Sequence, residues 1–500
     1  MSNDTEGQNA QQQSTTQNGF GNLNLSIVGL GVEYPPFLLA PADLDTLTKR
    51  HYPDSPAMKK VCTINNFTGI ETRSAIGTVD HPMANMNRAP TIAELCSIFL
   101  KDGVALAVTA CRKALHEAHL DPSDITHVVS TTCTNSANPG YDHFVCKALG
   151  ITQPVEKVLL HGIGCSGGLA SLRTAANLAL GHSFRGKKAR VLVMALEISS
   201  LLVRSELDSV HELQETRIGV TLFSDCASAC VLSNGIGGMG EEESVYDLLG
   251  WEHKMIPDTE HDLGFDVDPL GWKVILSPRV PKLAAEAVSP SYHSLISNLR
   301  SFPSEYRNPA DFDWALHPGG ATILTGVEKA MSISPEHMRA SYDTYMKHGN
   351  SSSATIFSVL DRLRCKDMDG LTPNSRGPKE MIVGCAFGPG IALEMCMLKR
   401  NLDHVKRKWD GGVQSGVGGE VTPPLTESEG GTRSVSGSEG EVEVQDLQKV
   451  KEEGEKLNQK LKTVEPGVLE QNARLGEDGK GNVNETLNSL EEAMDGVDLD

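Results

Sequence analysis

Short apolar runs alternate with longer amphipathic stretches between residues 23 and 400. Short apolar runs are typical of buried strands, and apolar residues that recur at helical spacing are typical of helices. The pattern predicts strands at 23–32, 126–134, 157–163 and 189–199, and helices at 91–119, 139–149 and 166–180. Alternation of this kind predicts an α/β fold with mainly buried strands.

Two pairs of segments resemble each other in sequence, a similarity that we call the internal echo. A helix and a loop lead into DITHVVSTTCT in the first half, and a helix and a loop lead into DFDWALHPGG much later. TLFSDCASACVL and GCAFGPGIALEMCML likewise share an order of aromatic, small and apolar residues. The echo suggests a duplicated α/β half.

The two ends of the chain differ from this body. Residues 1–22 are polar and are expected to form a flexible extension. Residues 401–500 carry eleven basic and 22 acidic side chains and are rich in Gly, Ser, Glu and Pro, which predicts a disordered acidic tail. Its apolar residues at spacings of three and four resemble a short coiled-coil seam, but a transient helix is the preferred interpretation because a glycine interrupts them: Leu447, Val450, Gly454, Leu457, Leu461 and Val464.

Composition and charge exclude several classes of protein. No apolar run among the 500 residues approaches the roughly 18 that a transmembrane helix needs, and the polar start does not resemble a secretory leader. We therefore expect a cytoplasmic protein without a membrane span. A formal charge of −20 argues against a nucleic-acid partner. Eleven cysteines without paired CxxC spacing favour reduced thiols over a disulfide framework or a zinc site.

Cys165 is the strongest candidate for a reactive group. In HGIGCSGGLASLRTAANLALG it lies between an apolar run and an alanine- and leucine-rich helix, at a predicted strand-to-helix turn. The helix dipole and the exposed amides there favour the thiolate, and the flanking glycines allow a substrate to approach the sulfur. Most free cysteines are buried as small apolar residues, which is our interpretation of Cys111, Cys146, Cys226, Cys230 and Cys396.

His317 and Asn350 are candidate partners for that thiolate. His317 closes the apolar run in DWALHPGGATILTGVEKA, so the following Pro-Gly-Gly turn would present its imidazole at the end of a strand. Asn350 follows a glycine at the start of a helix in YMKHGNSSSATIFSVLDRL. As an N-cap it needs no further explanation, and as a catalytic amide it would donate to a developing oxyanion.

Taken in order, these segments resemble the type III polyketide synthases, the chalcone and stilbene synthase-like family of the thiolase superfamily. The resemblance covers about residues 25–400 and rests on GIETR, TNSANPGYD, GCSGG, LFSDCASA, HPGG, HGNSSSAT and GCAFGPG. The combination of TTCTNSANPG with GIGCSGG is most similar to the fungal 2′-oxoalkylresorcylic acid, alkylresorcinol and alkylpyrone synthases.

The resemblance implies a role for each candidate. Cys165 would attack an acyl-CoA thioester and hold the starter and the growing chain, with its thiolate paired to His317. His317 and Asn350 would then donate to the thioester oxygen of malonyl-CoA as carbon dioxide leaves. Acyl-CoA and malonyl-CoA would be the substrates, and the resemblance implies no further cofactor and no metal.

The resemblance also assigns a substrate cavity. Phe223 corresponds to a gatekeeper aromatic between the CoA tunnel and the cavity, and Phe265 to a second one, with core packing as the alternative for both. Ala386 replaces the first glycine of the family's GFGPG segment. Residues assigned to the lining are Cys133, Thr134, Ser199, Leu202, Gly319, Gly320, Ser352, Phe387, Gly388, Pro389 and Gly390. Small side chains there would leave space for an alkyl chain, so a long-chain fatty acyl-CoA is the expected starter.

Docking of CoA would require local cations on this acidic protein. Lys59, Lys60 and Arg73 lie where the family places its basic cluster, although Thr63 and Ile64 stand where another lysine is expected. The resemblance also assigns Ala321 to CoA binding. Arg279 and Lys282 are alternatives that are equally well explained as surface charges.

The implied architecture is the five-layered αβαβα thiolase fold in a homodimer. Residues 23–250 would form the half that carries Cys165, and residues 251–400 the half that carries His317 and Asn350. Two other functions remain open: a single-round enzyme similar to 3-ketoacyl-ACP synthase III, and a catalytically silent acyl-binding or scaffold protein. Phe223 and the AFGPG loop count against the first, and the complete Cys-His-Asn set counts against the second.

Overall fold

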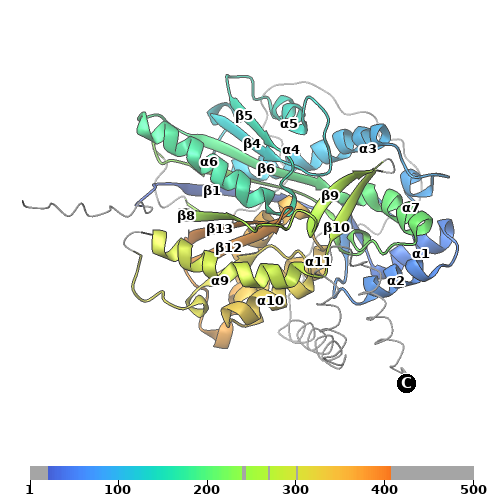
Figure 1. The fold of residues 1–500 in the computed structure, drawn as a ribbon. Helices are drawn as coiled ribbons and strands as arrows, with labels where there is room; N and C mark the ends of the chain where they lie inside the picture. The colour runs from blue at the N-terminus through green and yellow to red at the C-terminus, as the bar shows by residue number, and fades with distance from the viewer. Residues whose placement is uncertain (1–20, 239–243, 269–270, 300–301, 407–500) are drawn as a thin grey trace, which may run out of the picture.

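The computed structural model describes residues 21–238, 244–268, 271–299 and 302–406 (Figure 1). Most of the predicted N-terminal extension, the acidic tail from residue 407 onward and its possible coiled-coil seam lie outside the described residues. No helix of the described ranges is long and apolar enough to cross a membrane.

Within the described ranges, nine strands form one sheet in the order β11-β12-β13-β8-β1-β7-β6-β4-β5. Two short ribbons, β2 with β3 and β9 with β10, lie outside it. The strands are β1 Ser26–Glu33, β2 Phe37–Leu39, β3 Arg73–Ala75, β4 His127–Thr131, β5 Glu156–Leu160, β6 Arg190–Ile198, β7 Asp225–Ser233, β8 Tyr246–Met255, β9 Leu263–Asp268, β10 Gly271–Leu276, β11 Asp313–Leu316, β12 Met381–Gly388 and β13 Ala392–Arg400.

The two parts of this sheet repeat one pattern of pairing. β1 pairs antiparallel with β7, β7 antiparallel with β6, and β6 parallel with β4. β8 pairs antiparallel with β13, β13 antiparallel with β12, and β12 parallel with β11. The segments that echo each other in sequence occupy matching places, because DITHVVSTTCT contains β4 and DFDWALHPGG contains β11.

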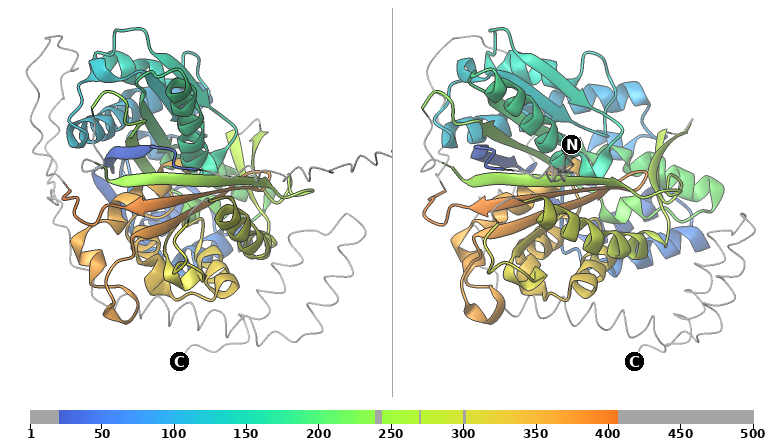
Figure 2. Two further views of the ribbon diagram at one scale, coloured as in Figure 1. Left: turned by 90° about the vertical axis from the view of Figure 1, so that its left-hand side faces the viewer. Right: turned by 60° about the vertical axis from the view of Figure 1, so that its left-hand side comes forward.

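Helices cover and separate the two parts of the sheet. They are α1 Pro41–His51, α2 Pro56–Asn66, α3 Ile92–Ile98, α4 Val104–Glu117, α5 Tyr141–Leu149, α6 Gly167–Phe184, α7 Val203–Leu213, α8 Gly219–Leu222, α9 Val280–Asn298, α10 Ala321–Met331, α11 Arg339–His348, α12 Thr355–Leu363 and α13 Lys366–Asp369. α6 and α12 contact strands of both parts, α4 covers β1 and β7 from outside, and α9 covers β8 and β13. Figure 2 shows the yellow helices of the C-terminal part on the opposite side of the strands from the teal helices. The result is five layers, with α6 and α12 in the central one.

The predicted elements match the structure closely in the first half. The strand predicted at 189–199 is β6, the one at 157–163 is β5, and the helix predicted at 166–180 is α6. The helix predicted at 91–119 is interrupted by a π-helical turn at Phe99–Gly103 between α3 and α4. The predicted boundary between the halves, at 250, falls inside β8, and the division into 23–250 and 251–400 stays a prediction.

Candidate active site

Cys165 lies on the short turn that joins β5 to α6. A 3-10 turn at Gly164–Ser166 carries it, and α6 begins at the next residue. Gly164 has a φ of +56°, a backbone conformation in which glycine avoids the strain of a Cβ. The thiol is buried, and burial raises the pKa of Cys165 to about 11. The hydroxyl of Ser352 and the amide of Asn350 act in the opposite direction, because each hydrogen bond favours the thiolate.

The AFGPG loop packs directly against this turn. A Cβ at Gly388 would lie 2.2 Å from Ser166 Oγ and 2.6 Å from the carbonyl oxygen of Ile163. A Cβ at Gly164 would in turn lie 2.8 Å from the ring of Pro389. The loop and the Cys165 turn therefore fit each other only because both contacts are made by glycine.

His317 follows β11, as the apolar pattern predicts. Its backbone amide donates to the carbonyl of Cys385 on the neighbouring β12, at 2.8 Å, which fixes the end of the strand. The side chain is buried, and neither ring nitrogen makes a hydrogen bond to any residue that the structure describes. Burial lowers the pKa of His317 to about 3. A buried imidazole without a protein partner has both nitrogens available to a substrate.

Asn350 joins the two halves of the site. Its backbone is held on both sides, since its amide donates to Leu222 at 2.9 Å and its carbonyl accepts from Ser224 at 2.9 Å. Its side-chain oxygen accepts from the amide of Ser352 at 2.8 Å. Its side-chain nitrogen lies 3.3 Å from the carbonyl oxygen of Gly319 and 4.0 Å from Cys165 Sγ.

The side-chain hydrogen bond of Asn350 closes an Asx turn and does not cap a helix. Its oxygen accepts from Ser352, two residues on, whereas α12 begins at Thr355 with Ala354 as its N-cap residue. The amide nitrogen is turned toward Cys165 and the loop after His317, and a catalytic role for it stays a prediction. The one side chain links Cys165 of the first half to Gly319 of the second.

Burial alone favours a neutral thiol and a neutral imidazole in this site. Opposite charges stabilise each other, so an imidazolium–thiolate pair would remove part of the burial penalty on each group. The pairing of Cys165 with His317, which the family resemblance implies, stays a prediction. A neutral imidazole still carries one N–H, so His317 can donate a hydrogen bond after the cysteine is acylated.

The two candidate gatekeepers lie together. The rings of Phe223 and Phe265 have centroids 6.0 Å apart and are tilted by 50°. Phe223 directly follows α8 and pairs with Asn350 in a β-bridge, so its position is tied to the site. Leu202 belongs to the apolar cluster against which Phe265 packs.

Glu197 is a central polar residue that the sequence analysis missed. This fully buried carboxylate on β6 accepts from the backbone amide of Cys133 at 3.1 Å and from the hydroxyl of Thr134 at 2.9 Å. Ser353 also donates to it, and Cys133 Sγ lies 3.3 Å from Ser352 Oγ. Burial raises the pKa of Glu197, and its charge acts with burial to raise the pKa of Cys165. An acidic residue within the apolar strand ARVLVMALEIS is the signal that could have revealed it.

The remaining predicted residues lie at several places. Ser199 is buried in the 3-10 turn Ser199–Leu202 that follows β6. Ala321 begins α10, directly after Gly319 and Gly320. Lys59 and Lys60 are on α2, where Lys59 forms an exposed ion pair with Asp54.

Arg73 differs from the two lysines. Its guanidinium is buried and donates to Asn65 and to the carbonyl of Thr221, both at 2.7 Å. Arg73 therefore holds β3 against α2 and against α8, the helix that directly precedes Phe223. Its guanidinium is not exposed to an incoming phosphate. Burial of the guanidinium does not favour a phosphate contact, and the assignment of Arg73 to CoA binding stays a prediction.

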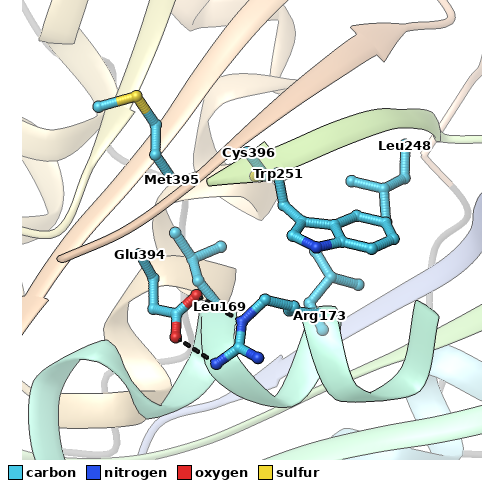
Figure 3. A pocket seen from close by; sticks show the side chains of 8 residues that line it. Leu169, Arg173, Leu248, Trp251, Glu394, Met395 and Cys396 are labelled. Atoms are coloured by element: carbon cyan, nitrogen blue, oxygen red, sulfur yellow. Dashed lines mark hydrogen bonds and ion pairs between the residues drawn. The ribbon is translucent and has the colours of Figure 1, made fainter. Parts of the chain in front are cut away.

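A separate small pocket lies between α6, β8 and β13 (Figure 3). Its apolar lining includes Leu169, Leu248 and Trp251. Its polar groups satisfy one another, since Arg173 donates to both oxygens of Glu394 at 2.9 and 2.6 Å. His253 Nδ1 lies 2.8 Å from the same carboxylate. The pocket lies where α6 packs against β8 and β13, and none of the candidate site residues lines it.

Comparison with known sequences gives a family for the whole body of the chain. Residues 57–235 match the family model "Chalcone and stilbene synthases, N-terminal domain", and residues 248–401 match the C-terminal one. The type III polyketide synthase PspB of Penicillium soppii is 40% identical over 75% of this chain and 96% of its own length. The acylalkylpyrone synthase CsyB of Aspergillus oryzae is 37% identical over 75% of this chain and 94% of its own length.

Solved structures agree with these matches. A type III pentaketide synthase from Neurospora crassa superposes with a TM-score of 0.75 at 65% identity, over 76% of this chain and 100% of that one. CsyB in complex with CoA-SH superposes with a TM-score of 0.72 at 36% identity, over 75% of this chain and 100% of that one. These likenesses confirm the predicted thiolase fold.

Proposed function

The chain belongs to the chalcone and stilbene synthase family of type III polyketide synthases, and we propose that it joins a long-chain fatty acyl-CoA to several malonyl-CoA units. As a member of that family it is a transferase that performs decarboxylative condensation on CoA-linked substrates. The observation that carries the proposal is the side-chain nitrogen of Asn350, 4.0 Å from Cys165 Sγ and beside the loop that carries His317.

Cys165 takes the role of nucleophile. Its thiolate attacks the thioester carbonyl of the starter, and the carbon–sulfur bond to CoA breaks as CoA departs. The buried setting of the sulfur excludes water from the resulting acyl-enzyme, which limits premature hydrolysis. The same sulfur then holds the chain through each round of extension.

His317 and Asn350 take the role of donors to the extender. When malonyl-CoA loses carbon dioxide, the electron pair of the broken carbon–carbon bond moves onto the thioester oxygen as an enolate. The N–H of a neutral imidazole and the amide N–H of Asn350 stabilise that charge. The enolate carbon then attacks the acyl-cysteine thioester, which forms the new carbon–carbon bond and releases the Cys165 thiolate, with the extended chain on CoA. For the next round this thiolate attacks the thioester of the extended chain, and CoA departs as the chain returns to Cys165.

The proposal of a long alkyl starter rests on the family resemblance, which assigns the small side chains of Cys133, Thr134, Ser199 and Ser352 to the cavity lining. Of these, Ser352 hydrogen-bonds to Cys165 through its hydroxyl. One relative carries the name acylalkylpyrone synthase, and one solved neighbour is described as a pentaketide synthase. By analogy, the product is an alkylresorcylic acid, an alkylresorcinol or an alkylpyrone.

A starter series tests this proposal. The purified chain is incubated with malonyl-CoA and acyl-CoA starters from acetyl to stearoyl, and the products are identified by mass spectrometry. Resorcylic acids, resorcinols or pyrones from the long starters are the expected result. Activity only with malonyl-acyl carrier protein, and a single condensation, would instead indicate a ketoacyl synthase.

The homodimer is also part of the proposal. It rests on the family resemblance, and light scattering coupled to size exclusion measures it directly. A mass near twice that of one chain is expected, and a monomer at micromolar concentration would contradict it.

A further inference from the structure

Three potential metal ligands converge at one end of β4, β5 and α6, outside the candidate active site. His127 is the first residue of β4, Glu156 is the first residue of β5, and His182 lies in the last turn of α6. We propose that these three side chains bind one divalent transition-metal ion, such as Zn²⁺.

The parallel pairing of β4 and β5 brings two of these residues together, because His127 is the register partner of Glu156. α6 packs on β4 and adds the third. Nε2 of His127 and Nε2 of His182 each lie 3.9 Å from an oxygen of Glu156, and the three ligand atoms lie within 4.8 Å of one another. Figure 1 shows β4, β5 and α6 as neighbours.

The ring of His127 is held at Nδ1. This nitrogen lies 2.7 Å from the Thr126 hydroxyl, which also accepts from the backbone amide of Arg190 at 2.9 Å and lies 3.1 Å from its carbonyl oxygen. When the hydroxyl donates to that carbonyl, Nδ1 carries the ring proton and Nε2 has the lone pair that a metal needs. Metal binding at Nε2 selects this tautomer.

His182 has the same arrangement. Its Nδ1 lies 3.2 Å from the carbonyl oxygen of Lys188, which can only accept, so Nδ1 carries the proton and Nε2 the lone pair. Neither Nε2 atom makes a hydrogen bond to any described residue, although the His127 side chain is fully buried. Two lone pairs that face one carboxylate form the donor set of a metal site, with the second nitrogen of each ring held by an outer partner.

The local charges allow a cation here. Arg185 places a positive charge near His127, and Glu156 places a negative one there. The carboxylate of Glu156 supplies the negative charge that offsets Arg185.

The spacing fits a small tetrahedral ion. Zinc–ligand distances of about 2.0–2.2 Å place ligand atoms about 3.4 Å apart. The two nitrogens lie 3.9 Å from different oxygens of Glu156, and the three ligand atoms lie within 4.8 Å of one another, so the widest gap has to shorten by at most about 1.4 Å. Glu156 is 68% exposed and free to move, and water can complete the coordination. The three side chains are thus placed for a site with one adjustable ligand.

The site is distant from the chemistry. His182 is fifteen residues along α6 from Gly167, which corresponds to roughly 23 Å along the helix axis. A bound metal would tie the last turn of α6 to the edge strand β5, so it would act on stability and leave the condensation unchanged.

A cobalt titration of the full chain tests the proposal. After treatment with a chelator and its removal, Co²⁺ is added and its visible absorption is recorded. We expect one equivalent bound with d–d bands and without the thiolate charge-transfer band that cysteine ligands give. Glu156→Gln and His182→Gln should each weaken this binding at least tenfold.

His261→Gln is the matched control, because exposed His261 and Glu260 lie 4.0 Å apart and no third ligand joins them among the residues that the structure describes. The His261→Gln variant should bind Co²⁺ with the same affinity as the natural protein. Zn²⁺ should also raise the melting temperature of the natural protein and of His261→Gln, but not of Glu156→Gln. Equal binding by Glu156→Gln and the natural protein, or a spectrum with only thiolate character, would overturn the proposal.

Discussion

At the scale of single residues, the environment of each side chain determines its protonation. Burial raises the pKa of Cys165 to about 11 and lowers that of His317 to about 3. Each group alone would stay neutral over the physiological range. The donors Ser352 and Asn350 favour a thiolate in this site, and an imidazolium at His317 would favour it further.

Alkylation of Cys165 as a function of pH tests this coupling. The thiolate is the form that reacts with iodoacetamide, so the rate rises as pH passes the thiol pKa. In His317→Gln the imidazolium partner is lost, and we expect the midpoint to move upward toward about 11. Peptide mass spectrometry follows the label on Cys165. The same midpoint in both proteins would show that His317 does not influence the thiol.

Glu197 should raise the pKa of Cys165, whereas a protonated His317 would lower it. After burial, its negative charge is the main contribution that raises the pKa of Cys165. Glu197→Gln keeps the size of the side chain and removes the charge. We therefore expect alkylation of Cys165 at pH 9 to become about threefold faster or more, which corresponds to roughly half a pKa unit. Slower or unchanged alkylation in a variant that folds normally would contradict this role.

At the scale of elements, the apolar pattern predicted which segments carry the candidate site. Cys165 follows β5, His317 follows β11 and Asn350 precedes α12, as expected from the sequence. The pattern could not predict contacts between distant segments. The hydrogen bonds of Glu197 depend on how β6 packs beside β4, and the inward turn of Arg73 depends on contacts with Asn65 and Thr221.

The contact between the AFGPG loop and the Cys165 turn is the element-scale feature most sensitive to mutation. In Gly388→Ala the new methyl group would meet Ser166 Oγ at 2.2 Å and a backbone oxygen at 2.6 Å. We expect a loss of about 1–3 kcal/mol in stability and a lower kcat, because the turn must shift. Thermal unfolding and product formation measure the two effects.

Gly181→Ala is the control for that substitution. Its Cβ would meet no described atom within 4 Å and lies within α6, so it should be neutral or stabilising by up to about 1 kcal/mol. Equal unfolding temperatures and equal product formation in Gly388→Ala and Gly181→Ala would show that the AFGPG loop does not constrain the Cys165 turn.

At the scale of the whole molecule, buried ion pairs connect the two repeated parts. Glu117 at the end of α4 accepts from Arg364 at 2.6 and 2.9 Å, and from the amide of Leu30 at 2.8 Å. Arg364 follows α12 of the central layer. Arg173 and Glu394 make a second connection, between α6 and β13. The echo in the sequence predicted the repeat, whereas these pairs follow from how the repeats pack.

Removal of Glu117 should destabilise the whole fold. In Glu117→Ala the buried guanidinium of Arg364 loses one carboxylate and the amide of Leu30 loses its acceptor. Arg364 keeps its pair with Asp361 at 2.6 Å, so we expect a cost of about 2–3 kcal/mol, which should lower the denaturation midpoint followed by circular dichroism. Glu286→Gln removes half of an exposed pair with Lys282 and should change stability by less than about 1 kcal/mol. Similar midpoints for the two variants would contradict a structural role for the buried pair.

We propose that Cys165 holds the chain while Asn350 and His317 act on the extender. Mass spectrometry of the enzyme after mixing with palmitoyl-CoA, with and without malonyl-CoA, distinguishes these roles. We expect a palmitoyl group on the Cys165 peptide of the natural protein and of Asn350→Ala, and none on that peptide in Cys165→Ala. Extension by malonyl-CoA should be about 10²–10³-fold slower in Asn350→Ala. Product formation by Cys165→Ala, or acylation that maps to another cysteine, would show that Cys165 does not hold the chain.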